Sequence, residues 1–402
     1  HMSDIITKDL AKSVENLVIG WRRELHQCPE LGMKTVETEK IILRVLKEIG
    51  IEEVRSGIGG EDCHGVAAVI RGSLPGKCLG IRADCDALPI LEETGLPFAS
   101  RNPGCMHACG HDGHTAMGLG IAKILFENRD KLRGTVKMIW QPGEEGDNGA
   151  LKMIEDGVLE NPKVDAMIGH HSGTSRFQEV GPAQIGWTPE PSSFCITGWW
   201  AKFHGKSAHI AEPHLGADPL LAACYAVTEL QAVLSREKQP NKPAICAVSM
   251  FHAGDKNNII PDTCCLEGSI RSNNEEDQAF YYQRLTEIFE GVAKTMRCTA
   301  EVGYGHYLGT TDNDPEMVRR FVPIAEKALG KENVIEVKIA IPGGEDFSEF
   351  TKRVPCVYYY HGGNFGDERD FPQHSSRFDL NEQTLWSGVA VMTQFAFDWQ
   401  DM

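Results

Sequence analysis

The sequence lacks the features that would assign it to a membrane or to a nucleic acid. No stretch reaches the roughly 18 to 20 consecutive apolar residues that a membrane-spanning helix needs. Basic residues are in the minority, because 40 Lys and Arg stand against 57 Asp and Glu, for a net charge of −17. We therefore expect neither a nucleic acid nor a membrane as a partner, since both favour clustered positive charge. An anionic small substrate stays compatible with this charge, because a pocket can be basic beneath an acidic surface.

A secretory signal is also missing, because the N-terminus shows no basic segment followed by an apolar run. We interpret His1–Met2 as a cloning scar, which leaves open whether a native segment once stood there. The thirteen cysteines are odd in number and have no framework spacing, which favours reduced thiols over disulfides. These features predict a cytoplasmic protein in which some thiols are available to bind metal.

Length and hydrophobic patterning predict a globular protein with more than one domain. At roughly 150 residues per domain, a chain of 402 residues suggests two to three domains. In the first half, apolar residues at helical spacing alternate with short apolar runs at 66–70, 78–83 and 136–140. This alternation predicts an α/β layer with helices packed on a sheet.

The pattern changes near residues 187–191, where two prolines lie close together. Beyond them we expect strand 194–203, helix 218–237, strands 245–251 and 264–271, helix 275–296 and strand 299–304. This β-α-β-β-α-β order is that of a ferredoxin-like unit. After about residue 305 the α/β pattern resumes. The prediction is therefore an α/β domain of residues 1–187 and 306–402, interrupted by an inserted α+β domain of residues 188–305.

The densest cluster of chemically reactive side chains is residues 105–114, which contain two cysteines and three histidines. Thiolate and imidazole are the preferred ligands of zinc-like metals. Cys109 and His111 are separated by one glycine, a spacing that lets both side chains converge on one metal or on two adjacent metals. Two other interpretations are a closed structural zinc site and an ordinary loop with buried thiols.

Two adjacent acids, Glu144 and Glu145, follow the apolar run that ends at Trp140. At the end of a strand they project to different sides, so that one can bind a metal while the other faces a bound water. Taken alone, such a pair is more often part of a solvated loop. Asp86 follows another predicted strand, in the kind of loop where α/β sheets place their sites. The sequence has neither a Gly-rich phosphate loop nor a Gly-x-Ser-x-Gly elbow.

Together these motifs resemble those of the M20 metallopeptidases, within them the amidohydrolase branch of hippurate hydrolases and indole-acetyl-amino-acid hydrolases. The resemblance runs from Trp21 to Asp379. Its motifs are residues 82–89, 106–114, 141–146, 169–171, 205–209, 258–261 and 343–347, and His374. The resemblance implies a catalytic metal-binding domain, an inserted lid and dimerisation domain, and a homodimer.

The resemblance also implies two divalent metal ions per subunit. Their ligands would be Cys109, His111, Glu145, His171 and His374. A thiolate ligand favours zinc, with manganese, cobalt or nickel as alternatives. Cys109 stands where related branches have a bridging aspartate. Cys105 is its rival as the thiolate ligand, and His170 is the adjacent rival of His171.

Further roles follow from the same resemblance. Glu144 would be the general base that deprotonates a water bridging the two metals, and Asp86 would support the metal centre. His209 would stabilise the tetrahedral intermediate from across a dimer. The implied substrate-binding residues are Asn258, Arg271 and Gly344.

The expected activity is hydrolysis of the amide bond of an N-acyl amino acid, which yields a carboxylic acid and a free amino acid. A dipeptidase or aminopeptidase of the same family is the main alternative. A cysteine hydrolase that uses Cys105 or Cys109 with a nearby histidine is a second alternative. A non-catalytic binder on the same scaffold is the third.

Overall fold

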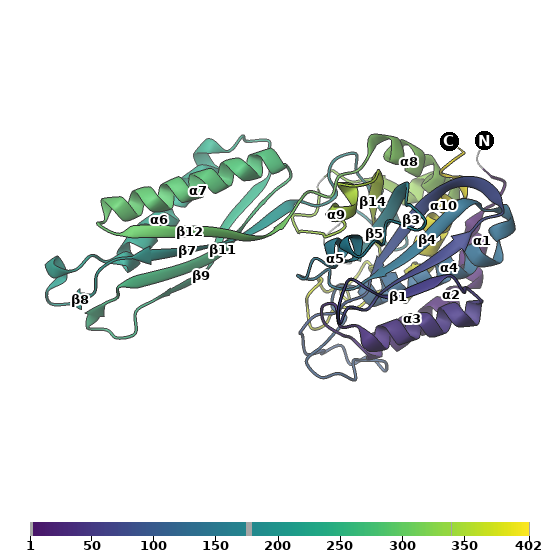
Figure 1. Cartoon of the computed structure of the whole chain (residues 1–402), viewed down its shortest axis with the longest axis horizontal. Coiled ribbons are helices and arrows are strands. Elements are labelled where there is room, and N and C mark those ends of the chain that lie inside the picture. Colours follow the sequence, from purple (N-terminus) through teal and green to yellow (C-terminus); the bar gives the residue numbers. More distant parts are fainter. Residues whose placement is uncertain (1–2, 174–178, 339, 402) are drawn as a thin grey trace. The chain divides into compact units, whose positions relative to one another are not determined.

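The computed structural model describes residues 3–173, 179–338 and 340–401, so the interpretation of His1–Met2 as a scar lies outside the described residues. The chain forms two compact units (Figure 1). Unit 1 comprises His1–Ser192, Thr311–Ile339 and Asp346–Met402, and unit 2 comprises Ser193–Thr310 and Ala340–Glu345. A large mixed sheet in one unit and a separate antiparallel sheet in the other confirm the predicted fold class.

An eight-stranded mixed sheet forms the centre of unit 1. In order across the sheet, its strands are β1 (Val54–Ile58), β2 (Gly65–Arg71), β4 (Arg133–Gln141), β3 (Leu74–Asp84), β5 (Ala166–Gly173), β14 (Cys356–Gly362), β6 (Ile185–Trp187) and β13 (Val334–Glu336). Strands β4, β3, β5 and β14 run parallel in the middle of the sheet. The three apolar runs predicted as strands are β2, β3 and β4. Central parallel strands are covered on both faces, and every residue of β5 is buried.

Helices pack against one face of this sheet and share a core with it. They are α1 (Thr7–Ser13), α2 (Glu15–Gln27), α3 (Val36–Ile49), α4 (His111–Glu127), α8 (Pro315–Leu329) and α10 (Leu385–Asp398). Alternate residues of β3, such as Leu79 and Ile81, point into this core. Helix α4 passes very close to the sheet, because a Cβ at Gly118 would lie 2.8 Å from the indole nitrogen of Trp140.

Shorter helices complete unit 1. Helices α5 (Gly149–Glu155) and α9 (Ser348–Thr351) contact each other. Single 3-10 turns are formed by η1 (Arg129–Lys131), η4 (Lys331–Asn333) and η5 (Glu382–Thr384). Among the described residues, no helix combines the length and the hydropathy that crossing a bilayer requires. All thirteen cysteines of the chain are free.

Unit 2 is a four-stranded antiparallel sheet with two helices on one face (Figure 1). Its strands, in order, are β12 (Thr299–Leu308), β7 (Cys195–His204), β11 (Thr263–Ser272) and β9 (Ala244–Ala253), and its helices are α6 (Pro219–Ala232) and α7 (Glu275–Thr295). Along the chain this gives the predicted β-α-β-β-α-β order. Asp218 and Asn274 cap the two helices by accepting backbone N–H groups of the first turn.

Two details of unit 2 go beyond the predicted elements. The helix expected over 218–237 leaves α-helical geometry after Ala232 and continues as the π-helical turn η3 (Val233–Glu237). There the Ser235 hydroxyl donates to the Gln231 carbonyl, a bond that competes with the helix ladder. A short ribbon also pairs β8 (Ala208–His209) with β10 (Ile259–Ile260), and a 3-10 turn, η2, spans Pro213–Leu215.

The carboxyl ends of the central strands of unit 1 place the chemically reactive loops along one edge of the sheet. Asp84, the last residue of β3, pairs in register with Gln141, the last residue of β4. The loops that follow carry Asp86 and Glu144, and His171 lies near the end of β5. This is the edge at which open α/β sheets place their binding sites.

Candidate metal centre

Three buried side chains converge at the N-terminal end of α4. The ligand atoms of Cys109, His111 and His171 all lie within 4.8 Å of one another. Cys109 precedes α4, and His111 is the first residue of that helix. Gly110 between them has a φ of 86°, a left-handed conformation that favours glycine. The turn at Gly110 is therefore part of what brings the thiol and the imidazole together.

Backbone carbonyls fix the protonation of both imidazoles. The Nδ1 of His111 lies 2.9 Å from the carbonyl oxygen of Asp86, and the Nδ1 of His171 lies 2.7 Å from that of Ser172. A carbonyl oxygen only accepts, so each Nδ1 carries the proton and donates it. In the neutral tautomer this leaves a lone pair on each Nε2, as in metal-binding histidines. The Nε2 of His171 lies 3.4 Å from the Cys109 sulfur.

A second group shares Cys109 with the first. The ligand atoms of Cys109, Glu145 and His374 also lie within 4.8 Å of one another. The Nε2 of His374 is 3.3 Å from Oε1 of Glu145. His374 has a φ of 69°, a strained conformation for a residue other than glycine, and such strain is concentrated at functional sites. One sulfur is thus common to two groups, which suits two adjacent cations.

The donor atoms fit divalent cations of the zinc type. His111 Nε2 and Glu145 Oε1 are buried beside other polar atoms, but neither makes a hydrogen bond of acceptable geometry among the described residues. Polar atoms are rarely left buried and unpaired, because each such atom costs roughly 1–3 kcal/mol. Cations that accepted a lone pair from each of these atoms would remove that cost. A donor set of thiolate, imidazole and carboxylate favours zinc-like ions over magnesium or calcium.

Asp86 holds the loop that carries the two glutamates. Its Oδ1 accepts the backbone N–H of Glu144 and its Oδ2 accepts that of Glu145, each at 3.0 Å. Burial raises the pKa of Asp86, although His111 and the Glu145 N–H oppose that shift. The Glu144 side chain is 9% exposed, and its Oε2 lies 3.8 Å from His111 Nε2. Asp86 therefore places one acid of the pair, Glu145, in a ligand group and the other beside it.

Neither rival residue joins these groups. Among the described residues, Cys105 and His170 occur in no cluster of metal-ligating side chains. The Nδ1 of His170 instead lies 3.1 Å from the Tyr359 hydroxyl in the interior. The cysteine-hydrolase alternative needs a thiol with a low pKa, whereas burial raises the pKa of Cys105 to about 11. Burial, together with nearby acids, also raises the pKa of Cys109.

Two residues beside the centre were not predicted. Asp84 and His114 form a further group with His111, in which Asp84 Oδ2 lies 3.3 Å from His111 Nε2. His114 Nδ1 bonds the other oxygen of Asp84, and His114 Nε2 accepts the Ser172 N–H at 2.8 Å. The available signal was that Asp84 directly follows the apolar run 78–83, but the prediction named Asp86, two residues later.

The four remaining predicted residues belong to unit 2. His209 pairs with Ile259 in the β8–β10 ribbon, and its Nδ1 accepts the Ala211 N–H. Asn258 directly precedes Ile259, and its backbone carbonyl accepts the Ile210 N–H. The ribbon therefore brings His209 and Asn258 close together.

Arg271 and Gly344 lie at a different place in unit 2, where both adjoin Ile196. Arg271 pairs with Ile196 across β11 and β7. A Cβ at Gly344 would lie 2.5 Å from Ile196 Cδ1, so a larger residue there would require the Ile196 side chain to shift. Both residues therefore stand beside the start of β7.

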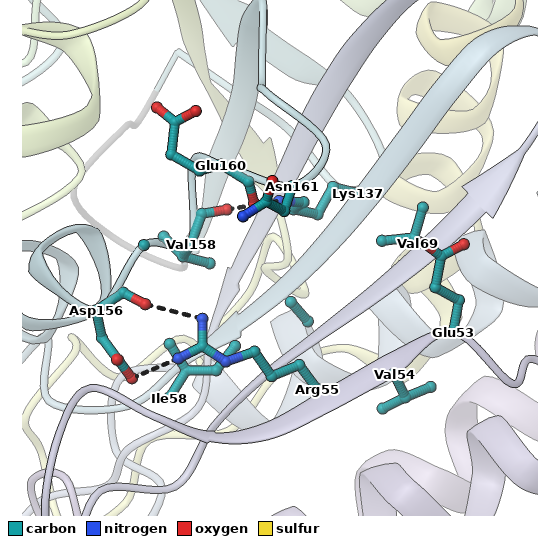
Figure 2. A pocket seen from close by; sticks show the side chains of 12 residues that line it. Glu53, Val54, Arg55, Ile58, Val69, Lys137, Asp156, Val158, Glu160 and Asn161 are labelled. Atoms are coloured by element: carbon teal, nitrogen blue, oxygen red, sulfur yellow. Dashed lines mark hydrogen bonds and ion pairs between the residues drawn. The ribbon is translucent and has the colours of Figure 1, made fainter.

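A separate pocket in unit 1 lies against β1, β2 and β4 (Figure 2). It has a volume of about 320 Å³, and none of its lining residues belongs to the groups described above. Both cations that line it already have partners: Arg55 pairs with Asp156, and the Lys137 amine donates to two backbone carbonyls (Figure 2). The convergence of ligating side chains therefore makes the carboxyl edge of the sheet, rather than this pocket, the candidate site.

Comparisons with known proteins agree with this geometry. The sequence model of Peptidase family M20/M25/M40 matches residues 80–398. The chain is 35% identical to N-acetyl-L-cysteine deacetylase of Bacillus subtilis (strain 168), over 93% of this chain and 86% of that protein. It is 34% identical to thermostable carboxypeptidase 1 of Saccharolobus solfataricus, over 95% of both. It also resembles the structure of the Bacillus subtilis YXEP protein, a dinuclear metal binding peptidase from the M20 family. The TM-score is 0.80 and the identity 32%, over 96% of this chain and 98% of that one.

Proposed function

The chain belongs to peptidase family M20/M25/M40, and from this membership and the geometry of its site we propose that it cleaves N-acyl amino acids. It is a metal-dependent amidohydrolase or peptidase. The products would be a carboxylic acid and a free amino acid. The similarity to a deacetylase of an N-acetyl amino acid over most of the chain supports this substrate class. The similarity to a carboxypeptidase supports peptide cleavage as the alternative.

One observation carries the proposed chemistry: Cys109 belongs to two ligand groups, and Glu144 lies beside them. In our assignment, Cys109, His111 and His171 hold one divalent cation, and Cys109, Glu145 and His374 hold the other. When bound, such cations lower the pKa of water and polarise an amide carbonyl. The thiolate favours zinc as the native ion.

The protein's own groups would then move the protons. Glu144 accepts a proton from the attacking water and passes it to the leaving amine. Asp86 keeps Glu144 in place through the two backbone hydrogen bonds described above. We assign Asn258, Arg271 and Gly344 to binding of the substrate's amino-acid part, with the Arg271 guanidinium suited to a carboxylate. His209 would donate to the developing oxyanion.

A substrate panel on the metal-loaded enzyme tests this function. We expect hydrolysis of N-acetyl and N-benzoyl amino acids, with little cleavage of dipeptides that have a free amino terminus. A Glu144→Gln variant purified in parallel controls for contaminating hydrolases. Faster cleavage of free dipeptides would favour the dipeptidase alternative. A folded, zinc-loaded enzyme that hydrolyses no member of the panel would contradict the proposal.

We also propose that the chain forms a homodimer through unit 2. Most of the exposed large apolar side chains of the described residues lie in that unit: Trp200, Ile210, Leu215, Leu221, Tyr225, Ile245, Met250, Phe251, Ile259, Phe280, Tyr304 and Tyr307. Surfaces this rich in exposed apolar groups mark protein interfaces. Strand β9 is the last strand of its sheet among the described residues, and an edge strand is a ready surface for association.

Subunit exchange tests whether His209 acts across such a dimer. A 1:1 mixture of Glu144→Ala and His209→Ala should recover about a quarter of the wild-type rate. The reason is that half of the exchanged dimers are mixed and one of their two sites is complete. The control is a chain with both substitutions mixed with Glu144→Ala, which should stay inactive. Exchanged heterodimers without recovered activity would rule out a role in trans.

A further inference from the structure

Arg22 on α2 is a fully buried cation held by three acids. Its Nε donates to Asp112 at 2.9 Å, its Nη2 to Asp379 at 2.9 Å and its Nη1 to Glu382 at 3.1 Å. Such an arrangement needs a planar guanidinium, because only this group directs several N–H donors outward at fixed angles. An ammonium on a flexible chain cannot replace it as a geometric link.

The three acids come from two segments that carry proposed metal ligands. Asp112 follows His111 directly in the first turn of α4. Asp379 follows His374 in the segment that leads into η5, and Glu382 is the first residue of η5. Arg22 is thus a single side chain that joins the surroundings of His111 to those of His374.

The neighbours of Asp112 extend this network in the interior. The Asp112 oxygen that accepts from Arg22 also bonds His26 Nδ1 at 2.7 Å. His26 Nε2 in turn lies 2.9 Å from Glu92. Asp112 is therefore tied both to the guanidinium and to a buried imidazole, and these two bonds fix its place in the first turn of α4.

Other contacts also hold the His374 segment. The backbone N–H of His374 donates to the Ala108 carbonyl at 2.7 Å. Phe378 and Leu380 pack in an apolar cluster with Cys109. These contacts would keep the segment folded without Arg22, but apolar packing does not fix direction as charged hydrogen bonds do.

We propose that Arg22 is a positioning residue of the metal centre, whose guanidinium sets the place of His374 relative to the first turn of α4. Arg22 touches none of the proposed ligands, so it acts through Asp112, Asp379 and Glu382. This role rests on the proposed metal centre. Substitutions that disturb residues behind the ligands typically weaken metal binding or activity by roughly 10- to 100-fold.

Two measurements test this role. The first is zinc affinity, determined by competition with a chelating dye, and the second is the separate determination of kcat and KM. The variants are Arg22→Lys and Asp379→Asn. Arg23→Gln is the matched control, because Arg23 is the next residue and also pairs with Glu382, but its side chain is 51% exposed. We expect Arg22→Lys to lower the affinity for the zinc ion assigned to His374 by roughly tenfold or more. The variant should also lower kcat, with KM little changed. Asp379→Asn should act in the same direction and less strongly, and Arg23→Gln should match wild type.

His374→Ala separates failure of this role from failure of the metal centre. If wild type binds fewer than two zinc ions, or if His374→Ala binds zinc as wild type does, the proposed centre itself is wrong. If both controls behave as expected but Arg22→Lys and Asp379→Asn keep wild-type zinc affinity and kcat, Arg22 only stabilises the fold. If Arg22→Lys does not fold, Asp379→Asn decides, because it keeps the bonds of Arg22 to Asp112 and Glu382.

Discussion

Replacing Asp86 by asparagine should loosen the turn that carries Glu144 without removing a proposed metal ligand. The buried Asp86 carboxylate accepts one N–H on each oxygen, at 3.0 Å from Glu144 and from Glu145. Asparagine has nearly the same size but only one acceptor oxygen, so one of the two N–H groups would face an NH₂ donor. A hydrogen bond to a charged group contributes about 1.5–3 kcal/mol, so we expect the turn to open roughly 10- to 150-fold more often.

Hydrogen exchange followed by mass spectrometry on peptides that cover residues 141–149 measures this opening directly. The amides of Glu144 and Glu145 should exchange faster by that factor, and kcat should fall by roughly 10- to 100-fold because the base is displaced. The matched control is Asp156→Asn. Asp156 also accepts a backbone N–H, from Gly59 at 2.9 Å, but it is 34% exposed, so the loss should stay below about 1 kcal/mol. Wild-type exchange at both glutamate amides together with wild-type kcat would refute the role given to Asp86.

Three further substitutions probe the same region. Glu144→Gln should keep two metal ions by elemental analysis and lower kcat by roughly 10²–10⁴-fold, the usual effect of removing a general base; a rate above about a tenth of wild type would exclude that role. Cys109→Ser should lower the metal content at both positions, and unchanged stoichiometry would remove the thiolate from the ligand set. Asp112→Asn should change how stability depends on pH in the metal-free protein. The folded pKa of Asp112 is depressed, so its stabilisation is present above the ordinary value of 3.8 and is lost as the pH falls below it. The difference in urea midpoint between wild type and Asp112→Asn should therefore shrink below that pH, and a constant difference would contradict the assignment.

The spacing of apolar residues and the residues that favour helix caps predict much of this fold. Strand β7 alternates between a helix-covered face and an open one, and Asn274 is a residue type that favours the cap position it occupies before α7. Strands β6 and β13 escape prediction because each has only three residues, too few for a period to show. Their pairing depends on contacts distant in sequence.

The candidate site also has parts that the sequence predicts and parts that it does not. The closeness of Cys109 to His111 follows from local spacing, whereas that of His374 to Glu145 depends on long-range folding and was implied only by the family resemblance. The link made by Arg22 was not foreseen, although one signal for it exists. Arg22 falls on the apolar stripe formed by Val18 and Leu25, all three of which are buried, so a charge stands where an apolar residue is expected. A cytoplasmic location and the absence of a nucleic-acid partner stay predictions.

The sharing of the Cys109 sulfur by both ligand groups would make the two cations chemically dependent on each other. Each ion would change the affinity for the other by the same factor, because such coupling is reciprocal. Oxidation of this one thiolate to a sulfenic acid would take a donor from both cations at once. A single oxidant molecule could then silence a subunit, and ions already in place would shield the sulfur from attack.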